Sequence, residues 1–182
     1  MEYKMTIAGK ERSLTLFPIN ENLQIAAFIM FSDVEITIES AKALLQKAPE
    51  FDVLITAECK GIPLVYEMSR QSGKNYVVAR KKPKLYMTGV FESTVNSITT
   101  QGEQKLYLDL ADAELMKGKR ILIVDDVIST GGSLKSLENL VNKAGGEVVG
   151  KMAILAEGDA IGRTDITYLA PLPLFDKNGN PL

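Results

Sequence analysis

The chain has 182 residues, 46% of them hydrophobic and 24% charged, which is the composition of an ordinary globular protein with room for a buried core. It contains no histidine and one cysteine, Cys59, which excludes histidine-based catalysis, histidine metal sites and an intramolecular disulfide. The net charge of −2 offers no footprint for nucleic acid, and no apolar run approaches the length of a membrane helix. We therefore expect one cytoplasmic domain over residues 1–182, away from membranes and nucleic acid.

In chain order, residues 1–31 come first and are expected to form a small hood over the core, together with residues from about 158 to 182. The last seven residues, 176–182, are expected to be a loose terminus. The pattern Ser32-Asp33-Val34-Glu35 is typical of a capping box and predicts a helix that runs to about Lys47.

Two more helices and five strands are expected further along the chain. The helices cover 61–72 and 133–144, and the second has an apolar stripe that ends at a Gly-Gly pair. Short apolar runs predict strands at 51–58, 75–80, 120–128, 147–155 and 165–175. Strands that alternate with helices indicate an α/β fold with a mainly parallel five-stranded sheet flanked by helices. The polar, β-prone insertion 83–105 is expected to be a mobile lid.

One stretch combines several chemical groups at the end of a predicted strand. Four apolar residues, 121–124, lead into Asp125 and Asp126, and the loop 129–133 (Ser-Thr-Gly-Gly-Ser) then opens the helix. Glycines let the backbone approach a phosphate, and a helix N-terminus presents free amides and a positive dipole end. The two carboxylates can accept hydrogen bonds from vicinal ribose hydroxyls. Neither a P-loop nor a G-x-G-x-x-G motif is present, so the pattern favours a phosphorylated sugar as ligand.

With these residues, the sequence resembles the type I phosphoribosyltransferase family, whose signature for phosphoribosyl pyrophosphate (PRPP) is an apolar strand, two acids and T-G-G-[ST]. The resemblance extends over about residues 50–157. Glu58-Cys59-Lys60-Gly61 is similar to the E-S-R-G loop of adenine enzymes, and residues 80–85 are similar to their R-K-x-x-K-L segment. The insertion occupies the place of the family's catalytic lid, and Leu155-Ala156-Glu157 looks like the purine-side segment of adenine and xanthine enzymes.

The resemblance implies a fold with a hood, a bound Mg²⁺ and a set of site residues. Asp125 and Asp126 would bind the ribose hydroxyls and the metal, and Glu103 on the lid is a candidate catalytic acid. A non-proline cis peptide bond is expected in the pyrophosphate loop, at Cys59-Lys60. The PRPP-binding residues would be Ser129, Thr130, Gly131, Gly132, Ser133, Glu58, Cys59, Lys60, Gly61, Arg80, Lys81 and Lys84, and the base-binding residues would be Leu23, Ile25, Val127 and Glu157.

The function that this resemblance implies is transfer of phosphoribosyl from PRPP to a purine base in nucleotide salvage, by a homodimer. Adenine is the first expectation, because the matching loops lean toward the adenine enzymes, and a 6-oxopurine is the second. Residues 22–26 depart from the adenine pattern, since they lack the Arg and Asp that adenine enzymes carry in the hood. The alternative is a sensor that binds PRPP without catalysis, since 60–64 and the lid also look like the effector domain of the purine operon repressor. Orotate is disfavoured because residues 88–104 contain no Lys or Arg.

Overall fold

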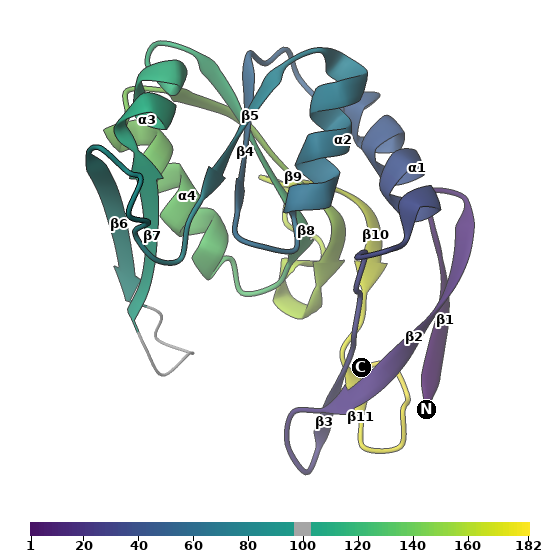
Figure 1. Ribbon diagram of the computed structural model, residues 1–182. Helices are drawn as coiled ribbons and strands as arrows, with labels where there is room; N and C mark the ends of the chain where they lie inside the picture. Colours follow the sequence, from purple (N-terminus) through teal and green to yellow (C-terminus); the bar gives the residue numbers. More distant parts are fainter. Residues whose placement is uncertain (97–102) are drawn as a thin grey trace.

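The core of the protein is a five-stranded parallel sheet, seen in Figure 1 between its covering helices. The computed structural model describes residues 1–96 and 103–182, with side chains described outside 94–104. The sheet order is β10-β9-β8-β4-β5. The strands are β10 (Thr167–Leu172), β9 (Glu147–Glu157), β8 (Arg120–Ile128), β4 (Val53–Ala57) and β5 (Asn75–Ala79). The predicted α/β sheet is therefore confirmed.

Helices cover both faces of this sheet, as the near-continuous apolar strands require. On one face, α1 (Val34–Leu45) and α2 (Ile62–Ser72) pack on a core that includes Leu54, Leu122 and Val124. On the other face, α4 (Gly132–Lys143) packs on Ile55 and Ile123. The two layers lie on opposite sides of the sheet in Figure 1. Within the described helices, none combines the length and hydropathy needed to cross a membrane.

The start of α1 differs from the predicted capping box. The N-cap is Asp33, whose Oδ1 accepts a hydrogen bond from the amide of Ile36, so the cap lies one residue later than Ser32. Glu35 does not close a box, because it pairs with Lys10 at 2.9 Å and Arg12 at 3.0 Å. These ion pairs join the helix to the N-terminal hairpin. The helix ends at Leu45, two residues before the predicted end.

The hood is a four-stranded antiparallel sheet in the order β1-β2-β3-β11, made from both ends of the chain. Its strands are β1 (Glu2–Ile7), β2 (Lys10–Pro18), β3 (Leu23–Ala26) and β11 (Phe175–Asp176). Alternate residues of β2, such as Leu14 and Leu16, are buried in the same apolar cluster as the core sheet. The hood is thus packed on the core, and in Figure 1 both termini lie at this end of the molecule.

The C-terminal segment corrects two predictions. The predicted strand 165–175 is two strands, because β10 belongs to the core sheet and β11 pairs with β3 of the hood. The last residues are also not loose. Asp176 accepts hydrogen bonds from the amides of Asn178 and Asn180 at 2.8 Å each, and the amide of Leu182 bonds to the carbonyl of Leu174. A hydrogen-bonded turn therefore ends the chain.

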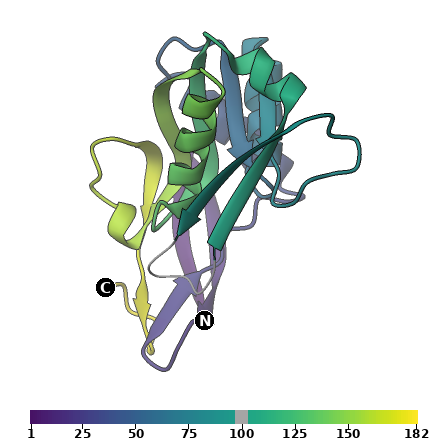
Figure 2. The same ribbon diagram turned by 90° about the vertical axis from the view of Figure 1, so that its left-hand side faces the viewer.

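The insertion forms an antiparallel hairpin of β6 (Val90–Asn96) and β7 (Glu103–Asp109), which packs against α4 (Figure 2). Reciprocal backbone hydrogen bonds between Arg80 and Tyr107, both 2.8 Å, join β7 to the end of β5. A short helix, α3 (Leu110–Met116), follows and was not predicted. The residue that could have indicated this helix is Asp109, the N-cap, whose Oδ1 accepts a hydrogen bond from the amide of Leu110. The predicted lid thus has a strand hairpin as its frame.

Candidate active site

The two signature carboxylates lie near the carboxyl end of β8, the central strand of the sheet. Ligands of parallel sheets bind outside this edge, where the loops after neighbouring strands meet. Two loops meet here, 58–61 after β4 and 129–133 after β8. A pocket of about 280 Å³ opens at the second loop, lined by Asp125, Val127, Ile128, Ser129, Thr130, Gly131, Gly132, Ser133 and Leu134. The structure brings together the two predicted acids, Val127 and the loop 129–133, which is called the phosphate loop below.

The loop 129–133 has the backbone geometry that its glycines predict. Gly131 is the N-cap of α4 and has a φ of +82°, a left-handed conformation that a side chain disfavours. No side chain caps this helix start, so the first amides of α4 are available to an anion. A helix N-terminus also favours negative charge through its dipole. The loop is therefore suited to hold a phosphate group.

The acid pair is electrostatically strained. Asp126 is buried, with 3% of its surface exposed, and its amide donates to Asp125 Oδ1 at 3.0 Å. Burial first, and then the charge of Asp126, raise the pKa of Asp125 well above its usual value. Two close carboxylates in a desolvated position stabilise any cation or hydroxyl donor placed beside them. The pair is thus organised for a ligand rather than for the stability of the fold.

The loop after β4 approaches the acid pair closely at Gly61. A Cβ at this position would collide with Thr56 Oγ1 and would lie 3.2 Å from Asp125 Oδ1. Only glycine fits, and its absence of a side chain lets α2 begin directly beside the carboxylates. The cis peptide bond of this loop lies between Glu58 and Cys59, one position before the expected one, because β4 already ends at Ala57. Cys59 itself is exposed.

The ammonium group of Lys60, in the loop after β4, lies beside the carboxylate of Asp126 on β8. Its Nζ lies 3.1 Å from Asp126 Oδ2, although the pair lacks the alignment of a hydrogen bond. Glu157, at the end of β9, faces the same charges: burial raises its pKa, Lys60 lowers it and Asp126 raises it. Half of the Lys60 side chain remains exposed, so its ammonium can also meet an incoming anion. The structure therefore groups Glu157 with Lys60 and the acid pair.

Glu58 organises the predicted basic segment. Its Oε2 accepts from the amide of Lys81 at 3.0 Å, while Oε1 lies 3.6 Å from Arg80 and 4.0 Å from Lys84. The Lys81 amide, followed by the nearby cations, lowers the pKa of Glu58. A carboxylate that is already paired in this way repels an anion, so its part in an anion site is to hold Arg80 and Lys84 in place. The side chain of Lys81 itself is exposed to solvent.

The remaining predicted residues lie on the hood and on the lid. Leu23 and Ile25 are half-buried on β3, and buried Gln24 between them donates to the carbonyl of Asp176 at 2.9 Å. Glu103 is the first residue of β7, but its side chain lies outside the described residues. The geometry thus gives these three residues a place in the fold without placing them against a ligand.

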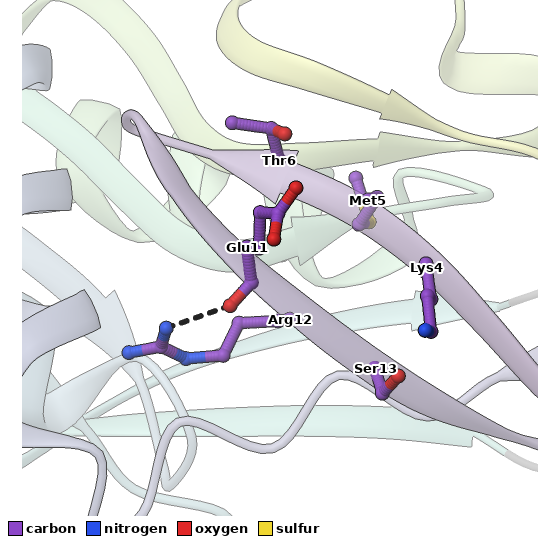
Figure 3. A pocket seen from close by; sticks show the side chains of 6 residues that line it. All are labelled: Lys4, Met5, Thr6, Glu11, Arg12 and Ser13. Atoms are coloured by element: carbon purple, nitrogen blue, oxygen red, sulfur yellow. Dashed lines mark hydrogen bonds between the residues drawn. The ribbon is translucent and has the colours of Figure 1, made fainter.

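Other hollows on the surface lack this combination of groups. The hollow in Figure 3 lies on the β1–β2 hairpin, and its guanidinium, Arg12, is committed to Glu11 O at 2.8 Å and to Asp33 at 2.6 Å. A second pocket of about 390 Å³ lies between α1 and α2 and is largely apolar, with Tyr66 and Tyr76 in its wall. Neither has a glycine loop or an acid pair, so the edge at β8 is the candidate active site.

The acid pair also fits a hard divalent cation that is brought by a ligand. The described residues contain no cluster of three or more acidic, histidine or cysteine side chains with the spacing of a metal site. Mg²⁺ usually keeps several waters and takes only one or two carboxylates beside phosphate oxygens. Asp126 Oδ2 is buried without a hydrogen bond, and a hydroxyl or a metal-bound water would satisfy it. The residues therefore fit a metal that arrives with PRPP.

Comparisons with known proteins agree with this geometry. The chain is 36% identical to an adenine phosphoribosyltransferase of Thermotoga maritima over 122 residues, which is 67% of this chain and 62% of that protein. It is 30% identical over 159 residues to a hypoxanthine/guanine phosphoribosyltransferase of Methanococcus voltae, covering 87% of this chain and 79% of that one. The alignments with the adenine relatives from Thermotoga span slightly less than two thirds of those proteins.

The fold itself is also shared with solved structures. Adenine phosphoribosyltransferase of Thermoanaerobacter pseudethanolicus superposes with a TM-score of 0.73 at 21% identity, over 87% of this chain and 95% of that one. The enzyme of Saccharomyces cerevisiae, solved with adenine and an imino-altritol bisphosphate, gives a TM-score of 0.70 at 19% identity, over 86% and 92%. The family description "Phosphoribosyl transferase domain" matches residues 34–169, which include both loops and the acid pair. The chain belongs to the phosphoribosyl transferase domain family.

Proposed function

We propose that the protein is a purine phosphoribosyltransferase that transfers the 5-phosphoribosyl group of PRPP to a purine nitrogen and releases pyrophosphate. The observation that carries the proposal is the convergence of two loops on one acid pair. Gly61 brings the start of α2 to Asp125, Lys60 pairs with Asp126, and the Gly131 loop opens α4 at the same edge. Similarity to curated purine enzymes of both base classes supports it.

The reaction breaks the bond from C1 of the ribose to the pyrophosphate oxygen and forms a bond from C1 to the base nitrogen. The proton on that nitrogen is released, and the transition state carries positive charge on the sugar. This chain contributes positioning and electrostatics: Asp125 and Asp126 hold the ribose hydroxyls, and their negative charge lies near the developing cation. The loop 129–133 binds the 5-phosphate, while Lys60, the amides of Cys59 and Gly61, Arg80 and Lys84 are placed for the pyrophosphate. A bound Mg²⁺, held by the acid pair, would neutralise pyrophosphate charge.

The base is proposed to lie between the core edge and the hood. Val127 lines the pocket beside the acid pair, and half-buried Glu157 completes the same edge. Leu23 and Ile25 of β3 would close the site from the hood. Adenine is our first expectation and a 6-oxopurine the second, since the relatives include enzymes for both. Glu103 is proposed as the acid that the hairpin brings to the reaction.

The test incubates the protein with PRPP, Mg²⁺ and one base at a time: adenine, hypoxanthine, guanine, xanthine, uracil or orotate. The nucleotide product of each reaction is then separated and measured by chromatography. The proposal predicts a nucleoside monophosphate with at least one purine and none with the pyrimidines. A chain that binds PRPP saturably but forms no product with any base would belong to the alternative class, a PRPP sensor. Glu103→Gln then tests the lid residue, and a product rate equal to that of the unchanged protein would contradict its role.

A homodimer is part of the proposal. The α1–α2 side of the molecule exposes Phe31, Val34 and Tyr66, with 47%, 67% and 56% of their surfaces accessible, around the apolar pocket. Apolar surface of this kind supports an interface between two copies. Light scattering after gel filtration should give twice the chain mass, and Tyr66→Glu should shift it toward the single-chain mass. A monomer at all concentrations would contradict the dimer.

A further inference from the structure

Arg163, which lies after the short turn Gly158–Ala160, contacts the phosphate loop from outside the signature. A Cβ added to Gly131 would lie 2.8 Å from Nη1 of Arg163, so the guanidinium occupies the space that a side chain on this residue would need. Both views of the molecule place the turn that precedes Arg163 at the same end of the core as the start of α4 (Figures 1 and 2). The segment after β9 therefore reaches the loop that opens α4.

The guanidinium is held so that one edge remains for the loop. Nε and Nη2 of Arg163 donate to the two oxygens of Asp165 at 2.9 and 2.8 Å. Among the described residues, Nη1 has no hydrogen-bond partner, and this is the atom that faces Gly131. A bidentate pair of this kind fixes the plane of the guanidinium and leaves the direction of its remaining N–H groups defined.

A chain of ion pairs ties this arrangement to α4. Asp165 also pairs with Lys151 of β9 at 2.9 Å, and Lys151 pairs with Glu138 of α4 at 2.8 Å. Glu138 in turn lies 3.4 Å from Lys135, which belongs to the first turn of α4. The anchor of Arg163 and the helix that carries the loop are thus connected by alternating charges. This network fixes the cation relative to the first turn of α4.

We propose that Arg163 is a positioning residue for the 5-phosphate. The inference rests on the proposed function, because it needs a phosphorylated ribose in the loop. Arg163 is not among the residues that line the pocket, so it acts through the loop: it packs on Gly131 and adds a positive charge to that of the helix N-terminus. The signature loop therefore binds the phosphate, and a cation from the segment that leads to the hood supports that loop.

The test compares ribose 5-phosphate and PRPP, both with Mg²⁺, by titration calorimetry. Arg163→Met should weaken the binding of both ligands by the same factor, about tenfold, because both carry the 5-phosphate and a positive charge near a phosphate contributes on the order of 1–2 kcal/mol in a partly solvated site. Lys60→Met, on the pyrophosphate side, should weaken PRPP far more than ribose 5-phosphate. Lys117→Met is the matched control, since it removes an exposed, ion-paired lysine outside this network and should change neither affinity more than twofold.

The conservative variant Arg163→Lys keeps the charge and should recover part of the lost affinity, which loss of packing alone would not explain. The outcome that overturns the inference is an affinity of Arg163→Met for ribose 5-phosphate within twofold of the unchanged protein, or an equal loss in Lys117→Met. If the unchanged protein binds neither ligand, the proposed function fails and the inference fails with it. The two failures are therefore distinguishable by the unchanged protein alone.

Discussion

The edge of the core sheet and the hood differ in how the chain builds them. At the core edge, the acids, the glycine loop and the helix start follow one another within residues 121–133, so one strand-loop-helix unit supplies most of the site. In the hood, β3 pairs with β11, and Gln24 bonds to the backbone of a residue 152 positions later. A local segment thus forms the proposed sugar-phosphate site, while the surface proposed to face the base depends on pairing between distant residues.

This difference means that the two regions should respond differently to substitution. Substitutions at the core edge should affect PRPP binding and turnover strongly, because few neighbouring groups could make the same contacts with the ligand. Changes in the hood should affect the choice and affinity of the base and leave PRPP nearly unaffected.

The largest effect is expected from the acid pair. Asp125→Asn combined with Asp126→Asn should reduce product formation by about a hundredfold or more, since two charged acceptors for the ribose hydroxyls are lost, each worth about 1.5–3 kcal/mol. Steady-state rates at saturating base measure this loss. Glu114→Gln on exposed α3 is the control and should leave the rate unchanged. A double variant with more than a tenth of the original rate would contradict the role of the pair.

Gly131→Ala should be next, with affinity for PRPP falling about tenfold. The new side chain would meet Arg163 Nη1 at 2.8 Å and would add the cost of a left-handed backbone, about 1–2 kcal/mol. The matched control is Gly118→Ala, where φ is +68° and the added Cβ meets nothing within 4 Å. Both variants should melt at lower temperature, but only Gly131→Ala should lose PRPP affinity. Equal PRPP affinity in the two variants would argue against a special role for this loop.

Gln24→Ala tests the hood. Its side-chain amide is buried and donates to the carbonyl of Asp176, which also accepts from the amide of Gly179 at 3.0 Å. The substitution removes the bond that joins β3 to the residue ending β11, and it should loosen the pairing of these two strands. The KM for the purine should rise several-fold while the KM for PRPP stays within twofold. Separate titrations of the two substrates give both values. A rise in the PRPP value instead would show that the hood and the core edge do not divide their roles in this way.

The smallest effect concerns stability and pH. The raised pKa of Asp125 means that the folded state disfavours its charge, so stability is lost as pH rises from the unfolded pKa through the folded one. Asp125→Asn removes this cost, and without ligand the variant should melt a few degrees higher at pH 7.5. The gain should shrink as pH falls and disappear below the unfolded-state pKa of about 3.9, where Asp125 is protonated in both states. Thermal melts across this range would contradict the account if the gain grew at low pH.

The sequence predicted those parts of the fold that depend on residues close together in the chain. The β8 strand, its acids and the amphipathic α4 follow from periodicity, and the parallel sheet follows from the alternation of elements. The cap of α1 was misplaced because Glu35 forms ion pairs with the hairpin, a contact between residues more than twenty positions apart. The split of 165–175 has the same origin, since Phe175 leaves the core sheet to pair with Gln24.

Arg163 shows what local patterns miss in the site itself. Nothing near it in sequence resembles a phosphate motif, and its place beside Gly131 depends on the crossing from β9 to β10 and on the Lys151–Glu138 pair. The sequence does contain one indication of this pair. Arg163 follows Gly162 in a turn and stands two residues before Asp165, a spacing at which an acid can hold a guanidinium in place. The base-side residues stay predictions for a similar reason, because the hood is assembled from both ends of the chain.

The most direct test of the central claim is pyrophosphate release measured with PRPP and Mg²⁺ alone, with a purine alone and with both together. The account predicts release only when both are present, at a rate that saturates with each substrate and disappears in the Asp125→Asn, Asp126→Asn variant. Saturable PRPP binding with no release for any purine would contradict the transferase and would assign the chain to the sensors.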